Sequence, residues 1–191
     1  MLIMLEEIKS AVISADVWLF KAVNSGLYND YLAYAMKFAA NDVFLVLFTA
    51  AGFFLLFRKW DRRDKTDTAF SLWAVIAANF ISSGLLKPLF ARKRPVAELV
   101  DVNFLVEMKR LGYAFPSTHT AMAAALAAAL WDRREARPYL AIFVFLTAFF
   151  CVYTGGHYPL DTAAGFVLGV IAGRSAVYIK RLYLKRSGYE N

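Results

Sequence analysis

Long apolar segments separated by short charged loops dominate this sequence. The five clearest segments are 43–57, 68–86, 120–131, 138–153 and 162–179. Hydrophobic residues make up 60% of the 191 residues, whereas globular domains average about 45–50%. A soluble fold of this size could not bury that much apolar surface. Because a helix needs about 20 residues to cross a bilayer, the pattern predicts an all-α, polytopic helical membrane protein with five to six transmembrane helices.

We expect a single membrane-embedded domain over residues 1–191, with amphipathic interfacial helices in 1–40, a transmembrane core in 43–179 and a basic cytoplasmic tail in 180–191. Charges interrupt the apolar residues of the first 25, which excludes the apolar core of a cleavable signal peptide. These charged residues are Glu6, Glu7, Lys9, Asp16 and Lys21. Two amphipathic helices fit this stretch, and whether one of them crosses the bilayer is left open by the pattern.

The distribution of basic residues sets the orientation. Lys and Arg cluster in the loop 58–65, in the loop 133–137 and in the tail 180–186. Threading the five segments puts these clusters on one side, which the positive-inside rule makes cytoplasmic. Since the cations lie in loops, the net charge of +7 indicates cytoplasmic retention and anionic lipid headgroups and gives no reason to expect a nucleic-acid partner.

The loops 87–115 and 154–161 then share the opposite face, which is periplasmic or outer in a bacterium. Lys87, Arg92, Lys93 and Arg94 lie there, against the charge rule. They are either ordinary loop charges or, as we favour, cations held for an anionic ligand.

Both histidines of the chain, His119 and His157, fall on the same outer face. Cations and helix N-terminal amides bind the oxygens of a phosphoryl group. One imidazole can attack phosphorus while a carboxylate such as Asp161 orients its far nitrogen, and another can protonate the leaving group. Each residue also has a structural alternative, because Asp161, Ser117 and Thr118 are residue types that cap helices.

Three segments resemble motifs of the type 2 phosphatidic acid phosphatase superfamily. Residues 87–95 match K-x6-R-P, residues 116–119 resemble P-S-G-H, and residues 157–161 resemble the end of S-R-x5-H-x3-D. The motifs occur in family order, and the resemblance covers about residues 30 to 180.

The resemblance implies a role for each matched residue. His157 would be the nucleophile, Asp161 its orienting partner and His119 the general acid. Phosphate would be bound by Lys87, Arg94, Ser117 and the Thr118 backbone amide, with Arg92 and Lys93 as possible helpers. The family needs no metal ion, so no cofactor is expected.

Two positions depart from the family motifs. Thr118 replaces a glycine, which is tolerable where the backbone does the binding. Cys151, the single cysteine, stands where the family has a phosphate-binding arginine, and Phe150 stands at the serine position. A thiol cannot replace a charged, bidentate guanidinium.

The sequence therefore predicts a membrane lipid phosphatase acting at the periplasmic face of a bacterial inner membrane. The family's substrates include lipid A 1-phosphate, phosphatidylglycerophosphate, undecaprenyl pyrophosphate and phosphatidic acid. The mixed charges of the outer loop favour a lipid A or isoprenoid substrate. The alternative suggested by Cys151 is a weakened or inactive protein that binds phospholipid. A transporter or channel has little support, because the charges lie at helix ends. The oligomeric state is not predicted.

Overall fold

The computed structural model describes residues 2–39, 62–105 and 112–187. All regular elements in these ranges are helical, which confirms the all-α prediction. In chain order they are α1 (Leu2–Asn24), α2 (Asp30–Ala39), α4 (Arg62–Asn79), the π-helix η1 (Phe80–Leu86), α5 (Lys87–Phe90), α6 (Pro95–Glu98), α7 (Thr118–Ala129), the 3₁₀ turn η2 (Arg134–Ala136), α8 (Arg137–Tyr153) and α9 (Pro159–Arg186).

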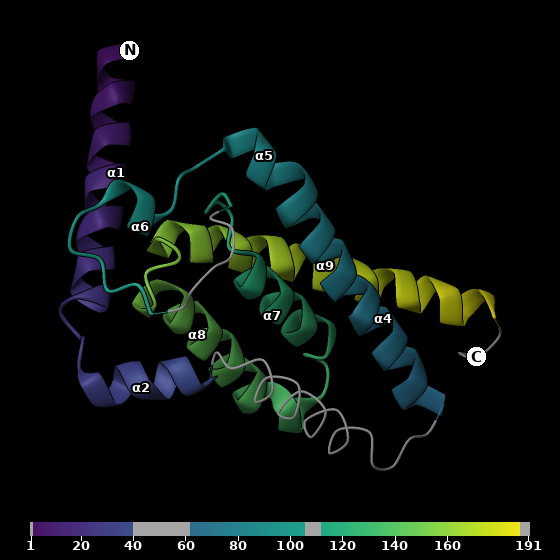
Figure 1. Ribbon diagram of the computed structural model, residues 1–191. Helices are drawn as coiled ribbons and strands as arrows, with labels where there is room; N and C mark the ends of the chain where they lie inside the picture. The colour runs from purple at the N-terminus through teal and green to yellow at the C-terminus, as the bar shows by residue number, and fades with distance from the viewer. Residues whose placement is uncertain (1, 40–61, 106–111, 188–191) are drawn as a thin grey trace.

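The short alanine-rich helix α7 lies at the centre of the bundle (Figure 1). It packs against α9, α4 and α8. A core of buried alanines joins it to α4 and α9 and consists of Ala74, Ala78, Ala121, Ala125, Ala172 and Ala176. Methyl side chains let the three helix backbones approach closely. On its other side α7 packs against Leu140 and Val144 of α8.

Glycines set the separation of α7 and α9. A Cβ added at Gly165, Gly169 or Gly173 would lie 2.4, 2.2 and 2.5 Å from backbone carbonyl oxygens of Ser117 and of α7. Such distances are far inside van der Waals contact, so only glycine fits at these three positions. The expectation that this glycine spacing allows close helix contact is confirmed, and the contact fixes where the N-terminal ends of the two helices meet.

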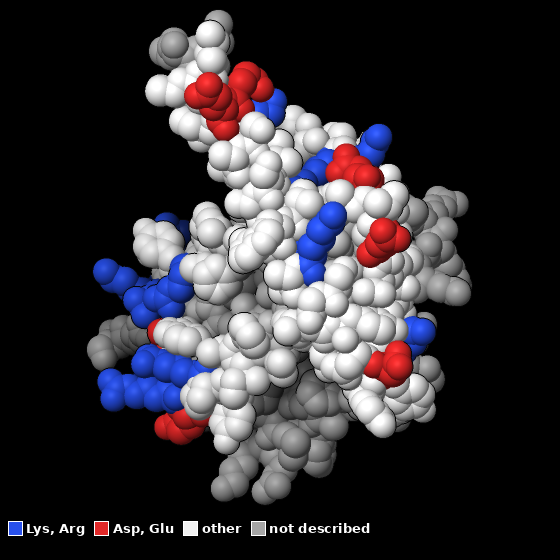
Figure 2. All heavy atoms as spheres, turned by 90° about the vertical axis from the view of Figure 1, so that its left-hand side faces the viewer, with Lys and Arg blue, Asp and Glu red and all other residues white. Residues whose placement is uncertain are grey.

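Three described helices are long and apolar enough to cross a membrane: Lys65–Glu98, Arg134–Tyr153 and Pro159–Arg186. They contain the predicted segments 68–86, 138–153 and 162–179. Large apolar side chains are exposed along these helices, and Figure 2 shows a face on which uncharged residues cover a broad middle zone. The chain is an integral membrane protein.

The predicted segment 120–131 differs from a membrane-spanning helix of ordinary length. Helix α7 has 12 residues and extends about 18 Å, whereas the hydrocarbon core is about 30 Å thick. Most of its residues are buried by neighbouring helices, so α7 is a short interior helix. The predicted segment 43–57 lies outside the described residues.

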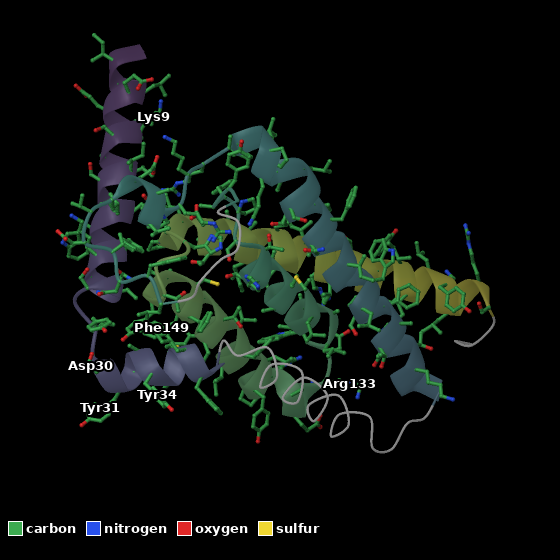
Figure 3. The ribbon with its side chains drawn as sticks, viewed as in Figure 1. Lys9, Asp30, Tyr31, Tyr34, Arg133 and Phe149 are labelled. Carbon is green, nitrogen blue, oxygen red and sulfur yellow. The ribbon has the colours of Figure 1, made fainter. Side chains whose placement is uncertain are left out.

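Two helices, α1 and α2, make up the described part of the first 40 residues. In α1, one face is buried and carries Asp16, Phe20 and Asn24 at intervals of four residues, while most of its other side chains are exposed. In α2, Tyr31 and Tyr34 are 90% and 75% exposed, and Figure 3 shows both extending from the helix. Exposed tyrosines are typical of helices at the membrane–water interface, and an interfacial location of this segment stays a prediction.

An ionic cluster joins helices at the end of the bundle where α7 finishes. The Asp67 carboxylate of α4 accepts hydrogen bonds from Arg133 Nη2 at 2.9 Å and from Lys180 Nζ at 2.8 Å. Arg133, labelled in Figure 3, lies just before α8, and Lys180 lies in α9. The loop 133–137 and the tail 180–186 therefore share one end of the bundle, as the charge pattern predicted.

Candidate active site

Segments from three parts of the chain meet where α7 and α9 begin. The Ser117 N–H donates to the Asp161 carbonyl at 2.9 Å, which joins the two helix starts. The Ala114 N–H donates to the Arg92 carbonyl at 2.7 Å, which attaches the cationic loop to the segment that leads into α7. The three motif regions thus form one connected site.

His157 lies in the turn between α8 and α9 and is only 3% exposed. Gly155 makes this turn possible, because its φ of +81° is a conformation that other residues rarely adopt. Beyond it, the His157 N–H donates to the Cys151 carbonyl at 3.1 Å. The Gly155 turn and the His157 backbone hydrogen bond therefore fix the position from which the imidazole extends.

The His157 ring stands between a cation and a carboxylate. Its Nε2 lies 3.3 Å from Arg94 Nη1. Its Nδ1 faces Asp161 Oδ2 at 3.7 Å, which is ion-pair range but too long for a hydrogen bond. Nδ1 has no hydrogen-bond partner within the described ranges. Burial, followed by the charges of Arg94 and Lys87, lowers the pKa of His157 to about 4, although Asp161 opposes the shift. The imidazole is therefore neutral at pH 7.

Arg94 is held in a defined orientation. Its Nε donates to the Gly112 carbonyl and its Nη1 to the Gly156 carbonyl, both at 2.9 Å. The Lys87 side chain, at the end of the long helical stretch, makes no hydrogen bond or ion pair in the part of the chain that the structure describes. Its charge acts on both His157 and His119. Lys87 is thus a cation left available for an anionic ligand.

His119 lies in the first turn of α7 and is exposed. Lys87 and Arg94 are the charged groups that act on it, and the same two act on His157. The two histidines therefore belong to one cationic site, as expected from the sequence, with one ring buried and the other accessible.

Ser117 and Thr118 have structural partners. Ser117 is the N-cap of α7, and its hydroxyl accepts from the Thr120 N–H at 3.5 Å. The Thr118 hydroxyl lies 2.8 Å from that of the fully buried Ser82 in η1. The capping alternative is therefore confirmed for Ser117, whereas a direct contact of either residue with phosphate stays a prediction.

Cys151 is buried at the end of α8. The Ser117 hydroxyl donates to its sulfur at 3.7 Å, and the charges of Arg94 and Lys87 act on it. The residue that replaces the expected arginine thus faces the same cations as the histidines do, so the substitution lies within the site.

Asp161 has more partners than the sequence indicated. Its Oδ2 accepts from the Tyr158 N–H at 2.8 Å, so it also caps α9. Its Oδ1 accepts from Arg92 Nη1 at 2.8 Å. Arg92 Nη2 donates in turn to Asp16 Oδ2 at 2.6 Å. Arg92 was expected only as a possible helper of phosphate binding, whereas here it contacts two carboxylates.

Asp16 was missed by the sequence analysis. It is only 2% exposed and accepts from the Leu160 N–H at 2.8 Å. The sequence contained a signal for the burial of Asp16. It lies four residues before Phe20 and eight before Asn24, so the three side chains share one face of a helix.

Comparison with known proteins identifies the family of the chain. A sequence model of the PAP2 superfamily matches residues 67–184, which include every motif residue discussed above. The chain belongs to the PAP2 superfamily. The resemblance noted in the sequence is therefore confirmed.

Three curated relatives of this PAP2 protein are each similar over part of their length. The bacitracin transport permease protein BcrC of Bacillus licheniformis is 25% identical over 68% of this chain and 63% of its own. The lipid A 4'-phosphatase of Bacteroides thetaiotaomicron is 25% identical over 78% of this chain and 70% of its own. The putative undecaprenyl-diphosphatase YbjG of Escherichia coli is 29% identical over 63% of this chain and 61% of its own. The chain thus spans slightly less than two thirds of the length of BcrC and YbjG.

Two solved structures share the fold. The crystal structure of Aquifex aeolicus LpxE has a TM-score of 0.63 and 26% identity, covering 85% of this chain and 94% of LpxE. A transmembrane PAP2-type phosphatidylglycerolphosphate phosphatase from Bacillus subtilis has a TM-score of 0.66 and 22% identity, covering 90% and 87% of the two chains. Both cover most of this chain, so the helical membrane architecture is that of PAP2 proteins.

Proposed function

We propose that this PAP2 protein is a membrane lipid phosphatase that hydrolyses a phosphate monoester or diphosphate through a phosphohistidine intermediate. The observation that carries the proposal is the position of His157, whose Nε2 faces Arg94 at 3.3 Å and whose Nδ1 faces Asp161 at 3.7 Å. A cation on one side suits the phosphoryl oxygens, and a carboxylate on the other suits the positive charge that the ring acquires on attack.

The reaction has two steps. The lone pair of His157 Nε2 forms a bond to phosphorus while the bond from phosphorus to the lipid oxygen breaks, and His119 gives a proton to that oxygen. Water then attacks phosphorus, the P–N bond breaks, and His119 takes the proton from the water. Lys87 and Arg94 neutralise the equatorial oxygens in both steps. The low pKa of His157 keeps Nε2 unprotonated and able to attack at pH 7.

Binding of the phosphoryl group requires a rearrangement around His157. Nε2 is covered by the Arg94 guanidinium, so phosphate must enter between the two groups and take over Arg94 as its own partner. The distance from Nδ1 to Asp161 shortens to a hydrogen bond as the ring becomes charged, which is common when a substrate-free site binds its ligand.

The residues described here require no metal for this chemistry. Within the described ranges, no group of three or more His, Cys, Asp or Glu side chains could hold a metal ion. Lys87 and Arg94 supply the charge that a metal would otherwise bring to the phosphoryl oxygens. Metal independence is thus part of the proposal, and activity that persists in excess chelator would support it.

The lipid nature of the substrate is supported by an apolar groove between α7, α8 and α9 with a volume of about 680 Å³. It begins at Thr120 and Thr162, close to the starts of α7 and α9, and reaches Trp131 and Arg174 at the other end. An acyl or isoprenoid chain would fit along it while the phosphate lies in the site. Lipid A 1-phosphate, phosphatidylglycerophosphate, undecaprenyl pyrophosphate and phosphatidic acid all combine such a chain with a phosphate.

The basic clusters support the proposed orientation. Asp67, Arg133 and Lys180 mark the end of the bundle opposite the site, and a basic end is retained in the cytoplasm. This distribution supports a site that faces the periplasm of an inner membrane, where lipid headgroups of the outer leaflet reach it.

Cys151 favours a second candidate function, a protein that binds phosphorylated lipid without turning it over. The thiol replaces a charged hydrogen-bond donor within the site, and loss of one such donor typically costs about 10²–10³ in rate. Retention of Lys87, Arg94 and both histidines favours the enzyme over this alternative.

Phosphate release decides between the two functions. Purified protein in detergent is incubated with the four lipids, and inorganic phosphate is measured for wild type, His157→Ala and the surface control Glu7→Gln. We expect wild type and Glu7→Gln to release phosphate equally and His157→Ala to lose at least about 10³-fold, the scale of losing a nucleophile. Lipid binding without phosphate release in wild type would establish the binding protein instead.

A further inference from the structure

Asp16 brings the N-terminal helix α1 into contact with the site. Its two oxygens have different partners: Oδ1 accepts from the Leu160 N–H at 2.8 Å, and Oδ2 accepts from Arg92 Nη2 at 2.6 Å. A carboxylate that is 2% exposed is costly unless it is paired and hydrogen-bonded. Both conditions are met, and both partners lie next to the catalytic histidine turn.

Arg92 joins two carboxylates that come from opposite ends of the chain. Its Nη1 contacts Asp161 at 2.8 Å and its Nη2 contacts Asp16 at 2.6 Å. The guanidinium also lies 4.1 Å from the centre of the Tyr158 ring, and the Tyr158 hydroxyl donates to Glu98 at 3.1 Å. A planar guanidinium with several fixed partners restrains the carboxylates that it binds.

The arrangement has an electrostatic consequence for His157. Arg92 alone would neutralise Asp161, which would then do little to stabilise positive charge on the imidazole. Because Asp16 supplies a second negative charge, the group of Asp16, Arg92 and Asp161 keeps a net negative charge. That net charge lies on the Nδ1 side of His157, opposite Arg94 and Lys87.

We propose that Asp16 and Arg92 are positioning residues of the active site, which fix the Asp161 carboxylate and preserve its negative charge toward His157. The inference rests on the proposed function, since it assigns Asp161 its role beside the nucleophile. It gives α1 a part in catalysis that neither the motifs nor the family match at residues 67–184 includes.

The first test measures His157 without a substrate. The chain has only 2 histidines, so ¹⁵N-histidine NMR gives two imidazoles, and a His119→Asn variant assigns them. The charged groups facing His157 are Asp161, Arg94 and Lys87, with Arg92 and Asp16 behind Asp161.

We expect Asp16→Asn to lower the measured pKa of His157 and its fraction protonated at Nδ1, because the uncompensated Arg92 then opposes positive charge on the ring. Glu7→Gln, an exposed change on the same helix, leaves both values as in wild type. Identical His157 spectra and titration in Asp16→Asn and wild type would overturn the proposal. The NMR titration of His157 needs no lipid turnover. A negative result in this test can therefore be told apart from a failure of the proposed function.

The second test is kinetic and separates positioning from a merely structural role. We expect Asp16→Asn to lower kcat about tenfold with KM nearly unchanged, the usual scale for losing a residue that orients a group in contact with the reacting atoms. In an Asp161→Asn background the same change costs less than about twofold, because Asp16 acts through Asp161. A full further loss of about tenfold in that background would show that Asp16 acts by another route, and the proposal would be wrong.

Arg92→Lys tests the geometry of the bridge, since it keeps the charge and loses the planar fork. We expect a kcat below that of wild type and a Tm within a few degrees of it. Wild-type kcat and an unaltered His157 spectrum in Arg92→Lys would contradict the positioning role of Arg92.

Discussion

Gly169→Ala is the substitution that most directly tests whether the packing of α7 on α9 sets the active-site geometry. The added Cβ would lie 2.2 Å from the Ala121 carbonyl oxygen, 2.6 Å from the Ala124 Cβ and 2.8 Å from the Ala125 N. Two of these three neighbours are backbone atoms, so no side-chain rotation relieves the overlap. The helices must separate by about 1 Å, a cost that we place at about 1–3 kcal/mol, the typical range for overpacking.

A larger distance between α7 and α9 also changes the geometry of the active site. Ser117 at the start of α7 is bonded to the Asp161 carbonyl at the start of α9 over 2.9 Å. A shift of about 1 Å between these helix ends moves His119 relative to His157, and a displacement of that size can lower the rate about 10²-fold. We therefore expect Gly169→Ala to lose about 10²-fold in kcat and to melt at a lower temperature than wild type.

A matched control is available in the same bundle. A Cβ at Gly84 would meet only Phe80 ring carbons at 3.7 Å, an ordinary contact. Phosphate release and thermal melting in detergent are measured for wild type, Gly84→Ala and Gly169→Ala. Full activity and an unchanged Tm in Gly169→Ala would refute the argument that helix separation positions the histidines.

Three further predictions follow from the site and its support. Cys151→Arg should raise phosphatase activity, up to about 10²-fold if the guanidinium reaches the phosphoryl oxygens, and equal or lower turnover would count against this role. Because the pKa of His157 is lowered to about 4, the nucleophile stays neutral as pH falls from about 7 to about 5, and the acid side of the kcat/KM profile should fall only near pH 4, while the alkaline side reports the proton that His119 donates; loss of the nucleophile near the ordinary histidine pKa of about 6.5 would contradict this. Asp67→Asn should destabilise the fold by about 3–5 kcal/mol, since it breaks a largely buried ion pair. In the exposed control Asp132→Asn the loss should stay below about 1 kcal/mol, and equal Tm values for the two variants would argue against the cluster.

Sequence reasoning predicted the parts of the molecule that depend on local pattern. Apolar length identified the three long helices, and the spacing of Gly165, Gly169 and Gly173 identified a close helix contact. The order of the motifs, combined with the membrane topology, placed His119 and His157 in one cationic site. The first two inferences use residues within one helix, and the third uses the order of segments along the chain.

What sequence reasoning missed depends on contacts between distant segments. The bridge from Asp16 through Arg92 to Asp161 joins residues 76 and 69 positions apart and exists only because α1 docks beside the start of α9. That protein surrounds most of α7 was equally hidden, because an alanine run looks the same whether lipid or protein surrounds it. The π-helix at Phe80–Leu86 carries no distinct sequence pattern, yet it places Ser82 against Thr118.

The central claim is that phosphate is transferred to His157, and trapping the covalent intermediate tests it most directly. Protein is mixed with a ³²P-labelled lipid phosphate, quenched within milliseconds under alkaline denaturing conditions, and assayed for protein-bound label. We expect wild type to carry acid-labile label. With a substrate whose leaving group needs no proton, His119→Ala should accumulate more label than wild type, because His119 promotes the second step, in which water hydrolyses the phosphohistidine. His157→Ala should carry none. Label that persists in His157→Ala, or turnover by wild type with no protein-bound phosphate at any time, would contradict the account.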